Sequence, residues 1–359
     1  MRRVRYQAAV GKGRSLLNFV GGISDRVMTR IPSFMLERSA LPRAEYVERL
    51  RFYADWADGA GERQFFVLPA EAPEAEVIER TPIADGERVL LRYPSRFAGH
   101  NPALRDALRA ATNNQYGYLH VWRHEPGAAR PLVLCVHGFA MAGPARAESM
   151  FKIKRLLECG LDVALHHLPH HWRRSERPPT SPFLRPQDVP LTIEEWVRNI
   201  HDLHSARLLL AGLGYGRVGL IGASLGGLTG ALYLCAGVAP PLDFVFLVVP
   251  AVDVAGYLEP RASLMSFTID AEVRDLTRRA LRRIVPTGYA PRFDVGRICI
   301  VAHEGDRICP VCYTRELVEH WQIQHYTEVA GGHWVYLDRR VRGRTWYGWL
   351  ESMGYLRTA

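Results

Sequence analysis

A serine flanked by glycines stands where an apolar strand would meet a helix. Residues 218–227 read Val-Gly-Leu-Ile-Gly-Ala-Ser-Leu-Gly-Gly, which places Ser224 in a G-x-S-x-G pattern ahead of a small-residue helix at 228–236. Gly222 and Gly226 remove the side chains that would clash in so tight a strand-to-helix turn. The hydroxyl would project above the sheet edge, over a helix N-terminus that favours negative charge. This pattern predicts a nucleophilic serine.

A carboxylate and a histidine follow the serine along the chain. The apolar run 297–302 leads into His-Glu-Gly-Asp, ending at Asp306, and a later short strand leads through two glycines to His333. A serine hydroxyl is a weak nucleophile until an adjacent base removes its proton, and the pKa of histidine lies near neutral pH. A carboxylate behind the histidine fixes its tautomer and stabilises the imidazolium. We therefore predict Ser224 as nucleophile, His333 as base and Asp306 as acid.

An early apolar strand ends in a third informative motif. Residues 131–139 read Pro-Leu-Val-Leu-Cys-Val-His-Gly-Phe. With this motif and the chain order serine, acid, histidine, residues 85–345 or so resemble the α/β-hydrolase superfamily. The resemblance implies an oxyanion hole made by backbone N–H groups, with a supporting loop. The residues concerned are Phe139 and Leu225 as donors, with His137, Gly138, Gly222 and Gly226 in support.

Other residues compete for the roles of acid and base. Asp253 follows the apolar strand expected at 244–250, and Glu304 stands just before Asp306. Asp306 is preferred because it lies in a Gly-Asp turn after the penultimate strand, where the resemblance places the acid. Among the 14 histidines of the chain, His333 is preferred for its double glycine, its late position and the tryptophan after it. The competing interpretation of that residue is an ordinary loop histidine.

Apolar runs with strand character alternate with helical stretches over most of the chain. The expected strands cover 88–93, 118–124, 132–137, 162–167, 217–222, 244–250, 297–302 and 325–329. Such alternation predicts an α/β fold with a mostly parallel, eight-stranded-type sheet and helices on both faces. Ligands bind such sheets beyond the carboxyl ends of the strands, where Ser224, Asp306 and Phe139 all fall.

The chain is expected to consist of two parts. A basic, partly helical N-terminal extension covers 1–84, and an α/β-hydrolase domain covers 85–359. Residues 68–87, rich in Pro, Ala and Glu, read as a linker or irregular segment. Two stretches would shape a pocket: a proline-rich, lid-like loop at 168–190 and a small cap-like insertion at 251–296.

Two groups of potential metal ligands are expected to be structural. Four histidines stand close together, with no carboxylate or cysteine among them, and neighbouring side chains on a strand point apart. They are His166, His167, His170 and His171. Polar packing at a pocket rim is therefore preferred to a metal site. Cys309 and Cys312 form a lone C-x-x-C, which favours a loop and helix start over a redox or zinc site. Neither a metal nor a cofactor is expected.

The net charge of +9 is unevenly distributed. Residues 1–30 hold seven basic residues and a single acid, Asp25, interleaved with apolar side chains. This mixture is compatible with contact to an anionic membrane surface, with a frayed basic arm, or with packing on the core. Nucleic-acid binding is disfavoured, because the other basic residues are dispersed and no nucleic-acid motif is present.

The sequence also bears on location. It has no run of about 18 apolar residues that would span a membrane, and its start lacks the apolar core and cleavage site of a secretory signal. The six cysteines are scattered, and Cys135 and Cys299 lie in buried-type strands, which favours a reducing compartment. We expect a cytoplasmic protein, with peripheral membrane contact through residues 1–30 as an open alternative.

These features together predict a serine hydrolase that cleaves carboxylic esters through a Ser-His-Asp triad and an acyl-enzyme intermediate. The substrate would be a small-molecule or lipid-like acyl compound, with amides and thioesters as alternatives. Competing hypotheses are a membrane-peripheral lipid hydrolase, an acyltransferase, and a catalytically silent hydrolase fold used for binding. The complete triad argues against the last, because a binding module has no need of all three groups.

Overall fold

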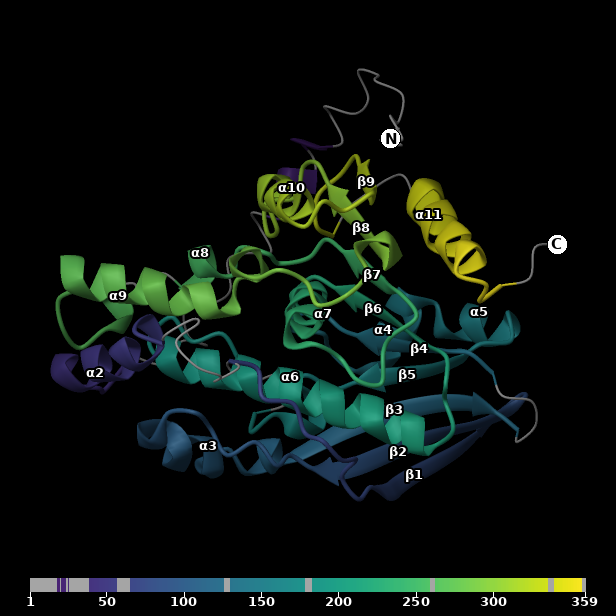
Figure 1. The fold of residues 1–359 in the computed structure, drawn as a ribbon, viewed down its shortest axis with the longest axis horizontal. Coiled ribbons are helices and arrows are strands. Elements are labelled where there is room, and N and C mark those ends of the chain that lie inside the picture. The colour runs from purple at the N-terminus through teal and green to yellow at the C-terminus, as the bar shows by residue number, and fades with distance from the viewer. Residues whose placement is uncertain are drawn as a thin grey trace.

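The computed structural model shows one sheet covered by helices (Figure 1). The residues it describes are 18–19, 21–23, 25, 39–56, 65–125, 130–177, 183–258, 262–334 and 339–356. The strands are β1 (Glu76–Ile83), β2 (Gly86–Pro94), β3 (Tyr116–His124), β4 (Leu132–Val136), β5 (Asp162–His166), β6 (Val218–Ala223), β7 (Val245–Val248), β8 (Ile298–His303) and β9 (His325–Val329). The α-helices are α2 (Arg43–Ala54), α3 (Arg105–Ala110), α4 (Pro144–Phe151), α5 (Ile153–Glu158), α6 (Val189–Gly212), α7 (Leu225–Ala236), α8 (Ala255–Leu258), α9 (Ala271–Leu281), α10 (Val311–His320) and α11 (Arg339–Ser352).

Among the described residues, nine strands form a single sheet in the order β1-β2-β3-β5-β4-β6-β7-β8-β9. The strands from β4 to β9 pair in parallel, whereas β1, β2 and β3 are antiparallel to one another and β3 is antiparallel to β5. The five strands from β4 to β8 are buried along their whole length, as parallel strands covered on both faces must be. The predicted α/β fold with a mostly parallel sheet is confirmed.

The strand that the sequence pattern did not reveal is β1. Residues 68–87 read as a linker, yet Glu76–Ile83 pairs with β2 at the edge of the sheet. Its side chains are exposed or half-buried, so it lacks the alternation of apolar and polar residues that marks a half-buried strand. An ion pair between Arg92 and Glu76 holds it beside β2. The sheet therefore has one strand more than the eight expected.

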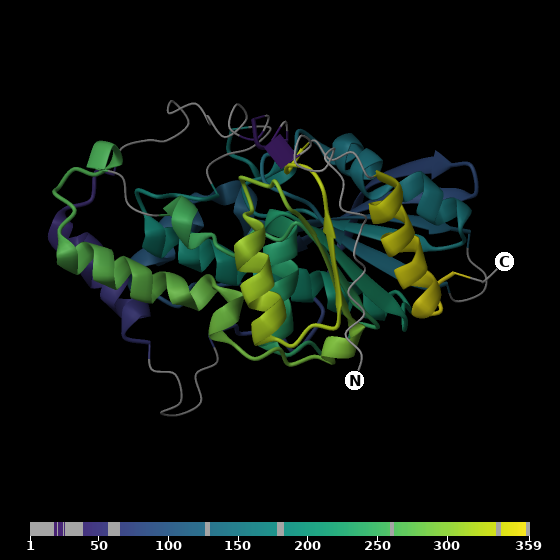
Figure 2. The same cartoon turned by 90° about the horizontal axis from the view of Figure 1, so that it is seen from above.

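Helices cover both faces of this sheet (Figures 1 and 2). Alternate residues of β4 point to opposite faces, as the two-residue period of a strand requires: Leu132 and Leu134 join one core cluster, and Val133 and Cys135 join the other. The first cluster includes side chains of α2, α6, α7, α9 and α10. The second includes side chains of α4, α5 and α11.

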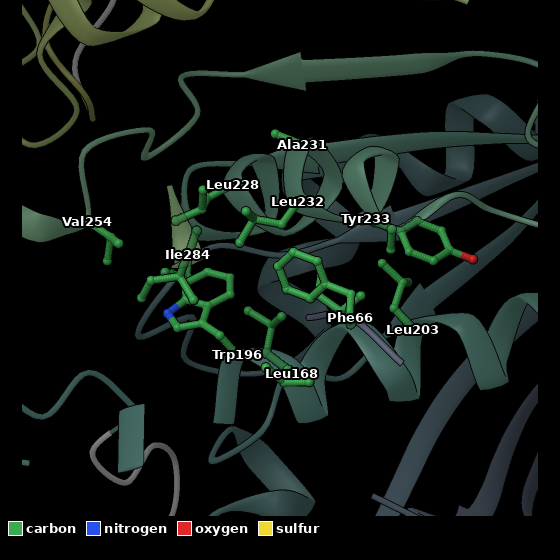
Figure 3. Close-up of a cluster of buried hydrophobic side chains, with 14 of the residues drawn as sticks. Phe66, Leu168, Trp196, Leu203, Leu228, Ala231, Leu232, Tyr233, Val254 and Ile284 are labelled. Atoms are coloured by element: carbon green, nitrogen blue, oxygen red, sulfur yellow. The ribbon is translucent and has the colours of Figure 1, made fainter. Parts of the chain in front are cut away.

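The larger cluster is built around α6, which is buried along nearly all of its length. In Figure 3, the ring of Phe66 lies among side chains of α6 and α7, with Leu203 and Leu232 on either side. Helix α9, from the cap-like insertion, packs against α2. Arg279 of α9 pairs with Asp55 at the end of α2 and strengthens this contact.

Candidate active site

Ser224 occupies the tight turn that the G-x-S-x-G pattern predicts. It connects β6 to α7, which begins at Leu225, and its backbone has φ 55° and ψ −115°. A positive φ at a residue other than glycine is a strained conformation that functional turns retain. A Cβ on Gly222 would lie 2.2 Å from the carbonyl oxygen of Gly226, and one on Gly226 would lie 2.1 Å from that of Val136. Glycine is therefore required at both positions.

The loop after β4 passes directly beside this serine. A Cβ on Gly138, the residue before Phe139, would lie 3.3 Å from the Cβ and 3.9 Å from the Oγ of Ser224. His137 is buried at the base of the loop, where its Nε2 accepts the N–H of Leu168 at 3.2 Å and its Nδ1–H donates to the Gly138 carbonyl at 2.8 Å. Burial holds the pKa of His137 well below its usual value, so the ring is neutral. His137 thus fixes the loop beside the serine.

The histidine-rich segment after β5 braces the same loop. His171 accepts the N–H of Ala140 at Nε2, at 3.1 Å, and its Nδ1–H donates to the carbonyl of Pro169 at 2.8 Å. The indole N–H of Trp172 donates to the carbonyl of Met141 at 2.7 Å. Burial lowers the pKa of His171 to about 4, which keeps it a neutral acceptor. Two consecutive residues therefore hold the loop that passes Ser224.

The other three histidines of that segment have separate partners. His166 bonds with Asn199, His167 with His120, and His170 with Asn114. Each ring is buried and directed to a different neighbour. This is polar packing of the kind that the sequence favoured over a shared metal.

His333 and Asp306 meet beyond the ends of β9 and β8. The Nδ1–H of His333 donates to Oδ2 of Asp306 at 2.7 Å, and both side chains are buried. The second carboxylate oxygen, Oδ1, accepts the N–H groups of Ile308 at 2.8 Å and Cys309 at 2.7 Å. Burial acts to lower the pKa of His333, but its contacts with Cys309 and Asp306 outweigh burial and hold that pKa well above its usual value. The pair is thus arranged to stabilise an imidazolium.

The two competing carboxylates face other partners. Glu304 accepts the side-chain amide of Asn18 at 3.1 Å. Asp253 accepts the N–H of Gly256 at 3.4 Å and lies near the hydroxyl of Tyr313. The carboxylate bonded to the predicted base is that of Asp306.

The thiol of Cys309 contacts both the serine and the histidine. Its Sγ is 4.0 Å from Ser224 Oγ, and it also contacts the side chain of His333. Within the part of the chain that the structure describes, Ser224 Oγ is bonded to this thiol and not to the imidazole. Burial raises the pKa of Cys309, although the nearby His333 acts to lower it. A third side chain therefore contacts both the predicted nucleophile and the predicted base.

Sequence reasoning missed this role of Cys309. The C-x-x-C pattern was interpreted as a loop and helix start, and α10 does begin at Val311. The available signal was the nearness of Cys309 to Asp306 in the chain. Because Asp306 accepts the N–H of Cys309, the chain turns back on itself and brings the thiol to the serine.

Asp306, Cys309 and His333 also form a group of potential metal ligands among the described residues, with ligand atoms within 4.8 Å of one another. A carboxylate, a thiolate and an imidazole are a ligand set suited to zinc. Here, however, both oxygens of Asp306 already accept hydrogen bonds, from two backbone N–H groups and from the imidazole of His333. The arrangement fits a hydrogen-bonded acid–base pair better than a metal centre.

Two residues of the N-terminal extension also reach the site. Asp25 contacts the backbone of His333, and Asn18 contacts the backbone of Gly331. In the sequence, Asp25 stands out only as the single acid of a basic stretch, and Asn18 carries no signal at all.

Comparison with known proteins identifies the fold. No profile of a known protein family matches the chain, and no curated protein matches it in sequence. Acetyl Xylan Esterase 1 from Thermoanaerobacterium sp. is similar in structure, with a TM-score of 0.55 at 12% identity over 86% of this chain and 93% of that one. The acetyl xylan esterase from Paenibacillus sp. R4 has a TM-score of 0.50 at 10% identity, over 90% and 99%. The chain has the α/β-hydrolase fold, as its motifs predict.

Proposed function

We propose that this protein is a serine hydrolase that cleaves carboxylic esters through an acyl-enzyme intermediate. The observation that carries the proposal is one continuous line of contacts at the carboxyl ends of three strands. Ser224 Oγ is 4.0 Å from Cys309 Sγ, Cys309 contacts His333, and His333 Nδ1 is 2.7 Å from Asp306 Oδ2. The line begins at a strained serine in a glycine-flanked turn. Its serine, histidine and carboxylate are the residue types of an acyl-transfer site, and they follow one another along the chain in the order serine, acid, histidine.

The proposed chemistry assigns each group one task. Rotation of the Cys309 side chain lets the imidazole of His333 reach Ser224. The serine oxygen adds to the ester carbonyl while its proton passes to His333, whose positive charge Asp306 stabilises. The negative carbonyl oxygen turns toward the backbone N–H groups of Phe139 and Leu225.

The intermediate then collapses in two steps. The departing alcohol takes the proton from His333 and leaves an acylated Ser224. A water molecule, deprotonated by His333, attacks the acyl group, and collapse of the second intermediate releases the carboxylic acid and restores the serine. The proton count closes over the cycle: one water is consumed, and one acid and one alcohol are formed.

The fold neighbours indicate which substrates to test first. Two structural neighbours, with TM-scores of 0.55 and 0.50, are both named acetyl xylan esterases. We therefore propose short acyl esters as the starting substrates, with longer acyl chains, amides and thioesters as the comparison set.

The decisive experiment is labelling with a fluorophosphonate probe, followed by hydrolysis of p-nitrophenyl esters of increasing chain length. Wild-type protein should label and turn over, and Ser224→Ala should do neither while keeping its thermal midpoint. Ser352→Ala, which alters an exposed serine on α11, is the matched control and should behave as wild type. Equal labelling of wild type and Ser224→Ala would show that another residue reacts and would end this assignment.

Exposed apolar side chains favour a second candidate, a hydrolase that works at a lipid surface. Three of the seven large apolar side chains that are exposed among the described residues come from the segments that meet at this site: Phe19 is 67%, Ile23 47% and Trp334 46% exposed. The net charge of +6 in residues 1–30 would favour an anionic surface. None of the helices in the described ranges is long and apolar enough to cross a bilayer.

Vesicle binding tests the second candidate. We expect the protein to sediment with vesicles of anionic phosphatidylglycerol and not with neutral phosphatidylcholine. Replacing Phe19 and Ile23 together by Ser should weaken sedimentation with the anionic vesicles, because the apolar contact is lost. Val67→Ser, at an exposed apolar side chain outside these segments, is the control. Equal binding to both kinds of vesicle, or to neither, would count against a lipid surface.

A further inference from the structure

The N-terminal extension contributes a buried carboxylate to the two loops that carry the proposed acid and base. Asp25 is 0% exposed. Its oxygens accept the backbone N–H of His333 at 3.0 and 2.9 Å, and Oδ2 also accepts the backbone N–H of Arg307 at 3.0 Å. Arg307 directly follows Asp306. One carboxylate thus joins the backbone of the base to the backbone next to the acid.

Asn18 makes a second bridge between the same two loops. Its side-chain N–H donates to Glu304 Oε2 at 3.1 Å, and its side-chain oxygen accepts the N–H of Gly331 at 2.8 Å. Glu304 precedes Asp306, and Gly331 precedes His333. Asn18 and Asp25 therefore each bind both loops. Figure 2 draws the described part of residues 18–25 in purple, near the end of β9.

The backbones approach so closely that three glycines are required. A Cβ on Gly21 would lie 2.1 Å from the backbone nitrogen of Gly332. A Cβ on Gly332 would lie 2.5 Å from the carbonyl of Gly21, and one on Gly305 would lie 2.6 Å from the Cα of Asn18. Contacts this short leave no room for a side chain at any of the three glycines. The described residues of the segment and the two loops therefore pack closely against one another.

We propose that Asp25 and Asn18 are positioning residues that hold the loop 304–307 and the loop 331–333 in the register needed for His333 to serve Ser224. This inference rests on the proposed function, because it assigns those loops to the acid and the base. The side-chain bond between His333 and Asp306 fixes their distance, but it does not fix where the imidazole stands relative to the elbow. Backbone bonds to Asp25 supply that constraint.

The chemistry of the contacts supports a positioning role. Backbone N–H groups that donate to a carboxylate form charge-assisted hydrogen bonds, which are stronger than those between neutral groups. Asp25 accepts the peptide N–H of His333, whereas the imidazole of that residue donates to Asp306. Its loss should therefore displace the base without removing a group from the site, and a displacement of about 1 Å in an active site can lower the rate roughly 100-fold.

The test uses the whole chain of residues 1–359 and four variants of it. Asp25→Ala and Asp25→Asn remove the carboxylate, and Asn18→Ala removes the second bridge. Asp106→Asn is the matched control, because the Asp106 side chain is 98% exposed. For each, we would measure kcat and KM on the best ester of the wild type, the fraction of active sites by fluorophosphonate titration, and the thermal midpoint.

A positioning role predicts a specific pattern. Asp25→Ala should lower kcat by about 10- to 100-fold while KM stays within about threefold, because the substrate pocket is intact and the base is displaced. Asn18→Ala should lower kcat less, and Asp106→Asn should not change it. A kcat within twofold of wild type in folded Asp25→Ala, or a KM that rises in step with the fall in kcat, would overturn the inference.

Hydrogen exchange provides a readout that needs no activity. In Asp25→Ala and Asn18→Ala, peptides covering 303–309 and 329–334 should exchange faster, while peptides of β4 and β6 should not change. If the wild type fails to react with fluorophosphonate, the proposed hydrolase is wrong, but exchange still decides whether the segment holds these loops. If Asp25→Ala does not fold, Asn18→Ala and Asp25→Asn carry the test. Unchanged exchange of both loops in these variants would refute the bridge.

Discussion

Lowering the pH from about 7 to about 5 is expected to destabilise this fold, because several buried histidines are held neutral in it, and three of them allow the size of the effect to be worked out. Burial lowers the pKa of His166 and of His171 to about 4, and that of His120 to about 3. Neighbouring guanidinium groups act in the same direction, Arg174 on His166 and Arg88 on His120. In the unfolded chain each imidazole regains a pKa near 6.5.

The sign and the size follow from proton uptake. Between the unfolded pKa and the folded pKa, the unfolded chain binds protons that the folded chain does not, so the free energy of unfolding falls as the pH falls. Each unit of difference between the two pKa values corresponds to about 1.4 kcal/mol. Because pH 5 lies about 1.5 units below the unfolded pKa of about 6.5, each histidine lowers the free energy of unfolding by about 2 kcal/mol. Three such histidines give roughly 6 kcal/mol, which is large against the 5–15 kcal/mol or so of a typical domain.

Other histidines with lowered pKa values, among them His137, His167 and His204, add to this loss, whereas the buried carboxylates contribute little in this pH window. Burial opposes ionisation of Asp202 and Glu195, but Arg174 and Arg198 outweigh it and lower both pKa values, so both carboxylates remain ionised above pH 5. The raised folded pKa of His333 has the opposite effect on stability: its contribution is fully present below about 6.5 and is lost only as the pH rises through the folded pKa. The buried neutral histidines therefore dominate between pH 7 and 5.

Urea unfolding at the two pH values, followed by tryptophan fluorescence, measures the effect. His166→Gln removes one titrating ring and keeps an amide beside Asn199, so its loss of stability between pH 7 and 5 should be smaller by about 2 kcal/mol. His320→Gln, at an exposed histidine at the end of α10, should lose as much as wild type. A wild-type loss below about 1 kcal/mol, with an unchanged dependence on urea concentration, would refute the reasoning.

Substitutions at three further positions probe the site itself. Gly226→Ala places a Cβ 2.1 Å from the carbonyl oxygen of Val136, so it should cost more than about 2 kcal/mol in urea unfolding and abolish labelling of Ser224; a stable, labelled variant would contradict the elbow geometry. His171→Ala removes the acceptor that holds the loop beside the serine, and should lower kcat about 10-fold at unchanged KM in ester assays. Cys309→Ala should keep kcat within about 10-fold of wild type, whereas Cys309→Met should lower it far more, because a longer side chain keeps base and serine apart; equal rates for the two would place the thiol outside the proton path.

The parts of the site that a sequence can predict are those encoded within a few residues. The elbow around Ser224 requires glycine at fixed offsets, and those offsets are visible without a structure. The central strands are equally visible, because strands covered on both faces must be apolar along their length. An edge strand such as β1 has no such requirement, and its pairing with β2 depends on backbone bonds and ion pairs that any polar sequence can make.

Cys309 illustrates a second limit. Its place in the chain marks the start of α10, and that interpretation is correct as far as it goes. What it does in the site depends on the turn by which Asp306 accepts two backbone N–H groups, and on the distance from that turn to β6. The distance from this turn to β6 is a property of the assembled sheet. The contact between the thiol and Ser224 therefore cannot be inferred from the spacing of two cysteines.

Asp25 illustrates the same limit over the whole length of the chain. In the sequence it lowers the charge of a basic stretch by one, and no pattern connects it with a histidine 308 residues away. In the folded chain this carboxylate is buried, and a buried carboxylate is stable only when hydrogen-bond donors surround it. The donors are backbone N–H groups of the two loops that carry the proposed acid and base. The elbow, the loop braced by histidines and these two loops each depend on contacts from another part of the chain. The geometry of the site is therefore a property of long-range packing, whereas its residue types are a property of local motifs.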